Sequence, residues 1–187
     1  MRSQKLASLL IALFIISLLN AQNFNYTAKW KEIESLNKKG LYDQALKQTK
    51  SLLEEAQKEQ NSVQTIKALI HQFNYSSAFE DDAVVKSIEQ LESLQEKENG
   101  VEQALINAAL SDLYLFYYQK NSWQINQRKD ISGARPSDIA YWSKKHFKTK
   151  IERLLESSLN YEKLLKETSS VYWKEIFSKD STGFEVF

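Results

Sequence analysis

The fold is decided by residues 30–46, which read WKEIESLNKKGLYDQAL. The first half of this stretch places Trp30, Ile33 and Leu36 three residues apart, so these apolar side chains share one face of a helix. Gly40 follows two lysines and suits the left-handed conformation that commonly ends a helix. The first half therefore predicts an amphipathic helix that stops at Gly40.

The second half of the stretch predicts a turn into a second helix. Gly40, Tyr42 and Ala45 have the spacing Gly-x-Tyr-x-x-Ala, which in tetratricopeptide repeats marks the tight turn between two antiparallel helices. The glycine turns the chain, the aromatic ring packs across the turn, and the small residue lets the helices approach closely. The motif has no second copy at the repeat period of about 34 residues, so a solenoid of irregular hairpins and a helical bundle both remain open.

Apolar periodicity predicts an all-α fold along the rest of the chain. The 187 residues include 4 glycines and 1 proline, too few for a turn-rich β-sandwich, and no alternating strand pattern of useful length occurs. We expect a helical domain over residues 22–160, followed by short helical pieces and a C-terminal tail over residues 161–187. The main helices are expected at about residues 26–39, 42–60, 61–73, 82–100, 101–120 and 136–159.

The helix expected at residues 101–120 is apolar around most of its circumference, as a helix in the middle of a bundle is. Its polar residues form one narrow stripe, made of Gln103, Asn107 and Ser111. Asp112 lies opposite this stripe, on the side expected to be buried, where Arg128, a lysine or a tyrosine hydroxyl would hold its carboxylate. The core positions expected on this helix are Leu105, Ala108, Ala109, Leu113 and Phe116.

The first 21 residues have the layout of a secretory signal peptide. Arg2 and Lys5 form a basic start, residues 6–19 are an uncharged apolar run, and Ala21 precedes the expected cleavage site. As a helix, the apolar run would span about 21 Å, which is short of the ~30 Å hydrocarbon core of a bilayer. We therefore expect cleavage after Ala21 and an exported protein, either periplasmic or secreted, without a stable membrane anchor.

Composition argues against catalysis and against several kinds of site. The chain has 0 cysteines and 2 histidines, which excludes a disulfide framework and a thiolate site and disfavours a histidine-rich zinc site. No nucleophile–base pair, phosphate loop or metal-binding motif is present, so we expect no enzyme, no cofactor and no metal. The 25 basic residues less Arg2 and Lys5 leave 23, against 24 acidic ones, so nucleic acid is not an expected partner.

Charge is nonetheless distributed unevenly along the chain. Residues 80–102 hold 8 acidic and 2 basic side chains, whereas residues 120–153 hold 9 basic and 3 acidic ones. Such runs are usually solvated helix faces. These two could also attract each other within the fold, or present a dipolar surface to a partner.

Residues 123–135 have weak periodicity, so we expect a loop of about a dozen residues there, a length that is typical of functional or flexible loops. Tryptophan and arginine are the residue types that most often dominate protein interfaces. The candidate partner-binding residues in this loop are Trp123, Arg128, Lys129 and Arg135. Alternatively, Trp123 and Ile125 tuck back and close one end of the bundle, because isolated tryptophans are usually buried to a large extent.

Short motifs follow one another in order over nearly the whole chain after residue 21. They are Trp30-Lys-Glu-Ile-Glu-Ser-Leu36, Gly40 with Ala45-Leu46, Leu113-Tyr114 with Tyr117-Tyr118, Asn121-Ser-Trp123-Gln-Ile125 with Arg128, Asp138-Ile139-x-x-Trp142, Ser158-Leu159 and Leu164-Leu165. This succession resembles the helical N-terminal region of large exported bacterial proteins of the alpha-2-macroglobulin type.

The resemblance implies a helical segment ahead of many macroglobulin β-domains, in proteins that trap or inhibit proteases with a bait region and, in some members, a thioester. This chain shows no bait region and, because it has no cysteine, no thioester. We therefore expect a non-catalytic docking or spacer module whose partner is a protein, either the downstream macroglobulin domains or another exported protein. The alternative is a free-standing periplasmic, tetratricopeptide-like scaffold that binds a protein or peptide in a helical groove.

Overall fold

The computed structural model describes residues 24–128 and 138–169, together with Tyr172 and Ile176. These residues form helices and contain no strand, so the all-α prediction is confirmed for the described part of the chain. The signal-peptide prediction falls on residues 1–21, outside that part. Within the described ranges, no helix combines the length and the apolar character needed to cross a bilayer.

The elements are α2 (Tyr26–Lys38), α3 (Tyr42–Lys58), α4 (Ser62–Ser76), α5 (Ala83–Gln95), α6 (Gly100–Lys120), α7 (Ser122–Asn126), the 3-10 turn η1 (Ile139–Tyr141), α8 (Lys144–Leu159) and α9 (Glu162–Glu167).

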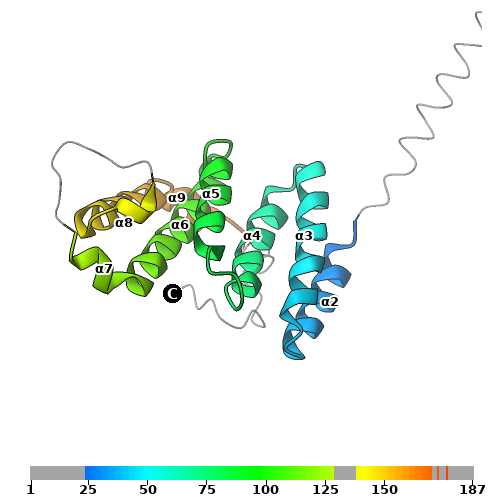
Figure 1. Ribbon diagram of the computed structural model, residues 1–187. Helices are drawn as coiled ribbons and strands as arrows, with labels where there is room; N and C mark the ends of the chain where they lie inside the picture. The colour runs from blue at the N-terminus through cyan, green and yellow to red at the C-terminus, as the bar shows by residue number, and fades with distance from the viewer. Residues whose placement is uncertain (1–23, 129–137, 170–171, 173–175, 177–187) are drawn as a thin grey trace, which may run out of the picture.

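Successive helices pack against one another in a row. Helix α2 packs on α3, α3 on α4, α4 on α5, α5 on α6 and α6 on α8, while α4 also contacts α6. In Figure 1, α3, α4 and α5 stand side by side with alternating direction, and α6, α7 and α8 form the left end of the row. A cluster of buried apolar side chains extends from Trp30 in α2 to Leu154 in α8 and holds the row together.

The turn between α2 and α3 has the backbone that the sequence predicts. Gly40 has a φ of +71°, in the left-handed region, and its N–H donates to the Asn37 carbonyl at 2.9 Å. Ala45 is fully buried, as expected. Tyr42 is 43% exposed, because it begins α3 at the outer end of the hairpin, where Leu41 is exposed as well, and its packing across the turn stays a prediction.

Two helix boundaries differ from the prediction. The fourth main helix, α5, ends at Gln95, and Gly100, with a φ of +62°, is instead the first residue of α6. The sixth main helix, α8, begins at Lys144 and not at residues 136–138, because Trp142 is extended and Ser143 caps the helix together with His146. The backbone N–H of Ser143 donates to His146 Nδ1 at 3.2 Å.

The expected loop at residues 123–135 begins as a helix. Asn121 ends α6, and its side-chain Nδ2 donates to the Tyr117 carbonyl at 2.9 Å, after which residues Ser122–Asn126 form α7. A five-residue helix is too short for apolar periodicity to show it in the sequence. Residues 129–137 lie outside the described part of the chain.

The polar stripe of α6 faces inward, which corrects the expected orientation of this helix. Asn107 and Ser111 are buried, because Gln95 of α5 supplies a hydrogen bond to Asn107 Oδ1 and the Ala108 carbonyl accepts from Ser111 Oγ at 2.7 Å. Asp112, expected to be buried and held by a partner such as Arg128, is half-buried without a hydrogen bond or ion pair from the described residues. Burial still raises the pKa of its carboxyl.

The core prediction for α6 is therefore correct in part. Ala109 and Leu113 are buried, and Leu105 and Ala108 are half-buried. Phe116 is 40% exposed, because it packs with one side against Phe73 of α4, at 5.4 Å between ring centroids, and turns the other side to solvent.

Candidate functional site

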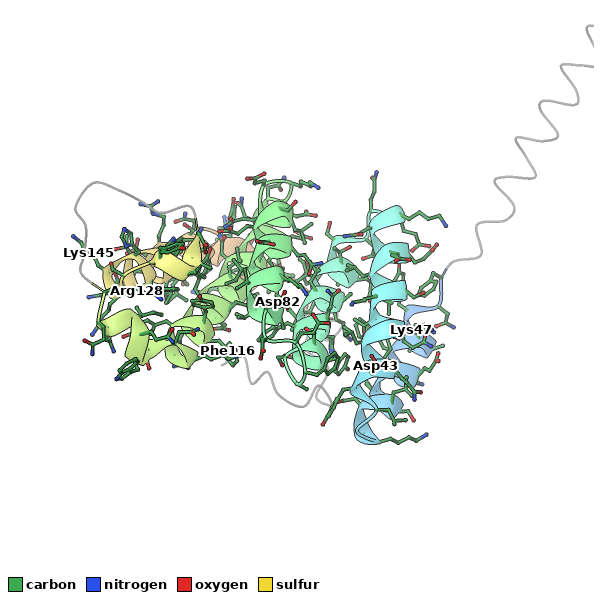
Figure 2. All side chains as sticks on the ribbon, viewed as in Figure 1. Asp43, Lys47, Asp82, Phe116, Arg128 and Lys145 are labelled. Atoms are coloured by element: carbon green, nitrogen blue, oxygen red, sulfur yellow. The ribbon has the colours of Figure 1, made fainter. Side chains whose placement is uncertain are left out.

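Two candidate partner-binding residues lie in the described part of the chain: Trp123 is on α7, and Arg128, labelled in Figure 2, follows this helix at the end of the molecule that α7 and α8 form. Trp123 is 77% exposed, whereas Ile125, two residues later on α7, is fully buried. Two residues are about 200° apart on a helix, so burying Ile125 turns Trp123 outward. Each of the two alternatives therefore holds for one residue. Ile125 is tucked back and closes the end of the row, whereas Trp123 remains accessible to a partner.

Arg128 ties α7 to the segment before α8. Its Nη1 donates to the backbone oxygen of Trp142 at 2.8 Å. The preceding residue, Tyr141, is 71% exposed at the end of η1. This hydrogen bond therefore links the segments that carry two highly exposed aromatic side chains, Trp123 and Tyr141. The other two candidates, Lys129 and Arg135, lie outside the described residues.

The start of α8 adds positive charge to this end. Lys144, Lys145 and Lys148 are exposed on its first turns, and Figure 2 shows Lys145 and Arg128 at the same end of the molecule. The nearby Asp138 accepts a hydrogen bond from the backbone of η1, at 2.7 Å from Ala140 N. We define the α7–α8 surface as Trp123, Arg128, Tyr141, Lys144 and Lys145.

The α7–α8 surface rests on packed aromatic rings. Trp142 stacks on Tyr114 of α6, with ring centroids 5.3 Å apart and an interplanar angle of 3°, and it contacts Phe147 at 5.3 Å. Phe147 is itself buried and stacks on Tyr117 at 5.6 Å. A surface whose supporting side chains are already ordered loses less conformational entropy when it binds.

One ion pair joins the acidic and basic regions of the chain. Lys150 Nζ lies 2.6 Å from Glu92 Oε1, and the Tyr114 hydroxyl donates to the same oxygen at 2.8 Å. Lys150 Nζ also lies 5.3 Å from the centroid of the Tyr114 ring. Burial, and then the bond to Glu92, raise the pKa of Tyr114 far above its ordinary value. Part of the charge contrast in the sequence is therefore used within the fold, in an ion pair between α8 and α5 beside Tyr114 of α6.

A second group of polar side chains is buried between α2 and α4. Trp30 Nε1 donates to Gln64 Oε1 at 2.7 Å, and Lys67 Nζ lies 4.6 Å from the centroid of the Trp30 ring. His71 Nδ1 and the Tyr75 hydroxyl are 3.2 Å apart. We call these five residues the α4 polar cluster.

Burial sets the protonation of the α4 polar cluster. It lowers the pKa of His71 to about 4, with a further contribution from the positive charge of Lys67, so the imidazole is neutral near pH 7. Burial also raises the pKa of Tyr75 to about 12. The sequence signal that could have found this cluster is the spacing of Gln64, Lys67, His71 and Tyr75, three or four residues apart on one face of α4.

The described residues bring together no three His, Asp or Glu side chains in a group that could hold a metal ion. Tyr141 was missed as a surface residue, because nothing in the sequence distinguishes its environment from that of the neighbouring Trp142. No family model, no curated protein and no solved structure matches the chain, and the resemblance to macroglobulin-type proteins stays a prediction.

Proposed function

We propose that the chain is a non-catalytic helical module that docks onto an acidic segment of another protein through the α7–α8 surface. The observation that carries this proposal is the 77% exposure of Trp123 on a helix anchored by the buried Ile125. Leaving so large an apolar ring in water has a cost, since a buried aromatic side chain removes about 150–250 Å² from solvent. A partner that covers Trp123 recovers that free energy.

The charge of the α7–α8 surface favours an acidic partner. Arg128, Lys144 and Lys145 contribute positive charge to the same end of the molecule as the exposed rings of Trp123 and Tyr141. Arginine and tryptophan provide multidentate hydrogen bonding and contact area, and lysines at the rim steer an acidic partner toward the surface. We therefore expect the bound segment to combine Asp or Glu with at least one apolar side chain.

The stacking of the hairpins supports a tetratricopeptide-like solenoid as the architecture of this module. The hydrogen bond between Trp30 of α2 and Gln64 of α4 joins residues 34 positions apart, which is the period of a tetratricopeptide repeat. Helices α4 and α6 also contact each other, so alternate helices meet as well as successive ones. Each hairpin of a solenoid contacts its neighbours in this way.

Export and the macroglobulin setting complete the proposal. The basic start, the apolar run and Ala21 favour cleavage and export, so mass spectrometry of the protein from its native host should find Gln22 as the first residue. In the setting that the resemblance implies, the partner would be macroglobulin domains that follow in a longer protein. A mature protein that still begins with Met1 would contradict export. The docking proposal does not depend on that result.

The docking proposal is tested with a random peptide library displayed on phage and selected on the chain at low salt. Peptides that bind the wild type should be enriched in acidic and apolar residues, and Trp123→Ala should fail to select them. Phe79→Ala is the matched control, because Phe79 is also an exposed aromatic residue, 51% accessible, and lies outside the α7–α8 surface. Selection of the same peptides by wild type and Trp123→Ala would refute the proposal.

A further inference from the structure

A groove runs between α3 and α5, with α4 as its floor. Two hollows of about 420 Å³ and 310 Å³ open along it and share Glu89 and Gln90 of α5. Each volume lies in the range of ~300–1,000 Å³ that is usual for ligand sites. We call this feature the α3–α5 groove. Its floor is one stripe of α4, made of Thr65, Leu69, Gln72 and Ser76.

The lining of the α3–α5 groove can both donate and accept hydrogen bonds. Carboxamide groups come from all three helices, at Gln57, Gln72 and Gln90, and hydroxyl groups come from Thr65, Ser76, Ser87 and Ser93. A side-chain amide presents the same donor and acceptor pair as a peptide bond. No aromatic ring lines the two hollows among the described residues, so a sugar or a nucleotide base finds no face on which to stack.

Gln72 brings an acceptor without a protein partner to the side of the groove. Its Nε2 donates to Gln90 Oε1 at 3.3 Å, while its Oε1 is buried and accepts no hydrogen bond from the described residues. Buried acceptors in proteins are nearly always paired. Gln72 lines the larger hollow, so a rotation of its side chain toward the groove would let this oxygen accept from a ligand N–H.

The length of the groove suits a short extended segment. Thr65 and Ser76, at the two ends of the floor, are eleven residues apart on α4, which corresponds to about 16 Å along a helix. An extended chain advances about 3.3 Å per residue, so this length holds about five residues. Lys50 and Lys97 stand near opposite ends and Glu89 lies between them, so charges are available to side chains of the bound segment.

We propose that the α3–α5 groove binds an extended peptide segment of about five residues through its main-chain amides, with Gln72 Oε1 accepting a hydrogen bond from a peptide N–H. This site lies on α3, α4 and α5 and is separate from the α7–α8 surface, so each proposal can fail without the other. The bound segment belongs to another polypeptide and is recognised mainly by its backbone, which predicts broad rather than narrow sequence preference.

Disulfide tethering tests the proposal, because a chain with 0 cysteines gives no background reaction. Ser93→Cys places one thiol at the edge of the groove, and Ser51→Cys places one at an exposed position of α3 that does not line it. Both variants are incubated with a library of five-residue peptides that carry one disulfide-activated cysteine, under partial reduction, and are read by intact-mass spectrometry. Ser93→Cys should capture peptides about tenfold more than Ser51→Cys.

Two further measurements distinguish recognition of the peptide main chain from non-specific peptide binding. Adding Gln72→Leu to Ser93→Cys should lower capture about threefold to tenfold, as the loss of one hydrogen bond does, and N-methylation of the peptide backbone should lower it similarly. Equal capture at both cysteines, or unchanged capture by Gln72→Leu, would each overturn the proposal.

Discussion

Acidification should destabilise the chain through His71, and His71→Gln should remove that part of the pH dependence. His71 is buried, 6% exposed, among Trp30, Gln64, Lys67 and Tyr75, which come from α2 and α4. Its pKa is lowered from 6.5 to about 4 by burial and then by the charge of Lys67. The unfolded chain therefore binds the proton more tightly than the folded one.

The two pKa values of His71, one for each state, fix the sign and the size of the effect. A histidine whose folded pKa is lowered contributes its full stability above pH 6.5 and loses it as the pH falls toward 4. The loss amounts to about 2 kcal/mol at pH 5 and about 3 kcal/mol once the pH is below 4. Such a loss is a large fraction of the ~5–15 kcal/mol that stabilises a typical domain.

Urea unfolding followed by circular dichroism at pH 7 and pH 5 measures this effect. Wild type should lose about 2 kcal/mol more than His71→Gln between the two values, because glutamine does not titrate. Ser51→Ala, at an exposed position of α3, is the control and should keep the wild-type difference. Equal losses for wild type and His71→Gln would refute the burial of a neutral imidazole between α2 and α4.

Four further substitutions test the packing. Gly40→Val should cost more than about 1 kcal/mol of unfolding free energy, because φ is +71° and a side chain there meets strain but no neighbour within 4 Å; an unchanged melting temperature would place the turn elsewhere. Phe73→Ala should cost about 3–5 kcal/mol and Phe116→Ala at most about half as much, since Phe116 is 40% exposed; equal costs by urea unfolding would contradict the orientation of α6. Glu92→Gln should cost about 1 kcal/mol, less in high salt, by weakening the pair with Lys150; no change in low salt would show that the pair contributes nothing.

The sequence predicted the main helices well, because their apolar positions repeat over three or more turns. It also predicted the left-handed Gly40, where the backbone conformation itself requires a glycine. The orientation of α6 could not be read in the same way. A helix that is apolar around most of its circumference has no single face that must point inward. In α6 the buried side includes Asn107, because Gln95 of α5 supplies a hydrogen-bonding partner for it.

The candidate site was predicted in residue type but not in arrangement. Tryptophan and arginine in one segment singled out Trp123 and Arg128 as candidates, yet the exposure of Trp123 depends on Ile125 being the residue that α7 buries. Neighbouring residues such as Tyr141 and Trp142 differ in exposure because Trp142 finds Tyr114 to stack on, a contact 28 positions away in the chain. Long-range contacts of this kind leave no local pattern in the sequence.

The central claim is that Trp123 anchors a partner on the α7–α8 surface. The most direct test is the ratio of each variant's Kd to the wild-type Kd for one acidic peptide. The Kd of an acidic peptide selected on wild type is measured by isothermal titration calorimetry for Trp123→Ala and for the control Phe79→Ala. A tryptophan at the centre of an interface contributes at least about 2 kcal/mol, so Kd should rise about thirtyfold or more for Trp123→Ala and stay within about twofold for Phe79→Ala. Equal Kd values for the two variants would contradict the claim.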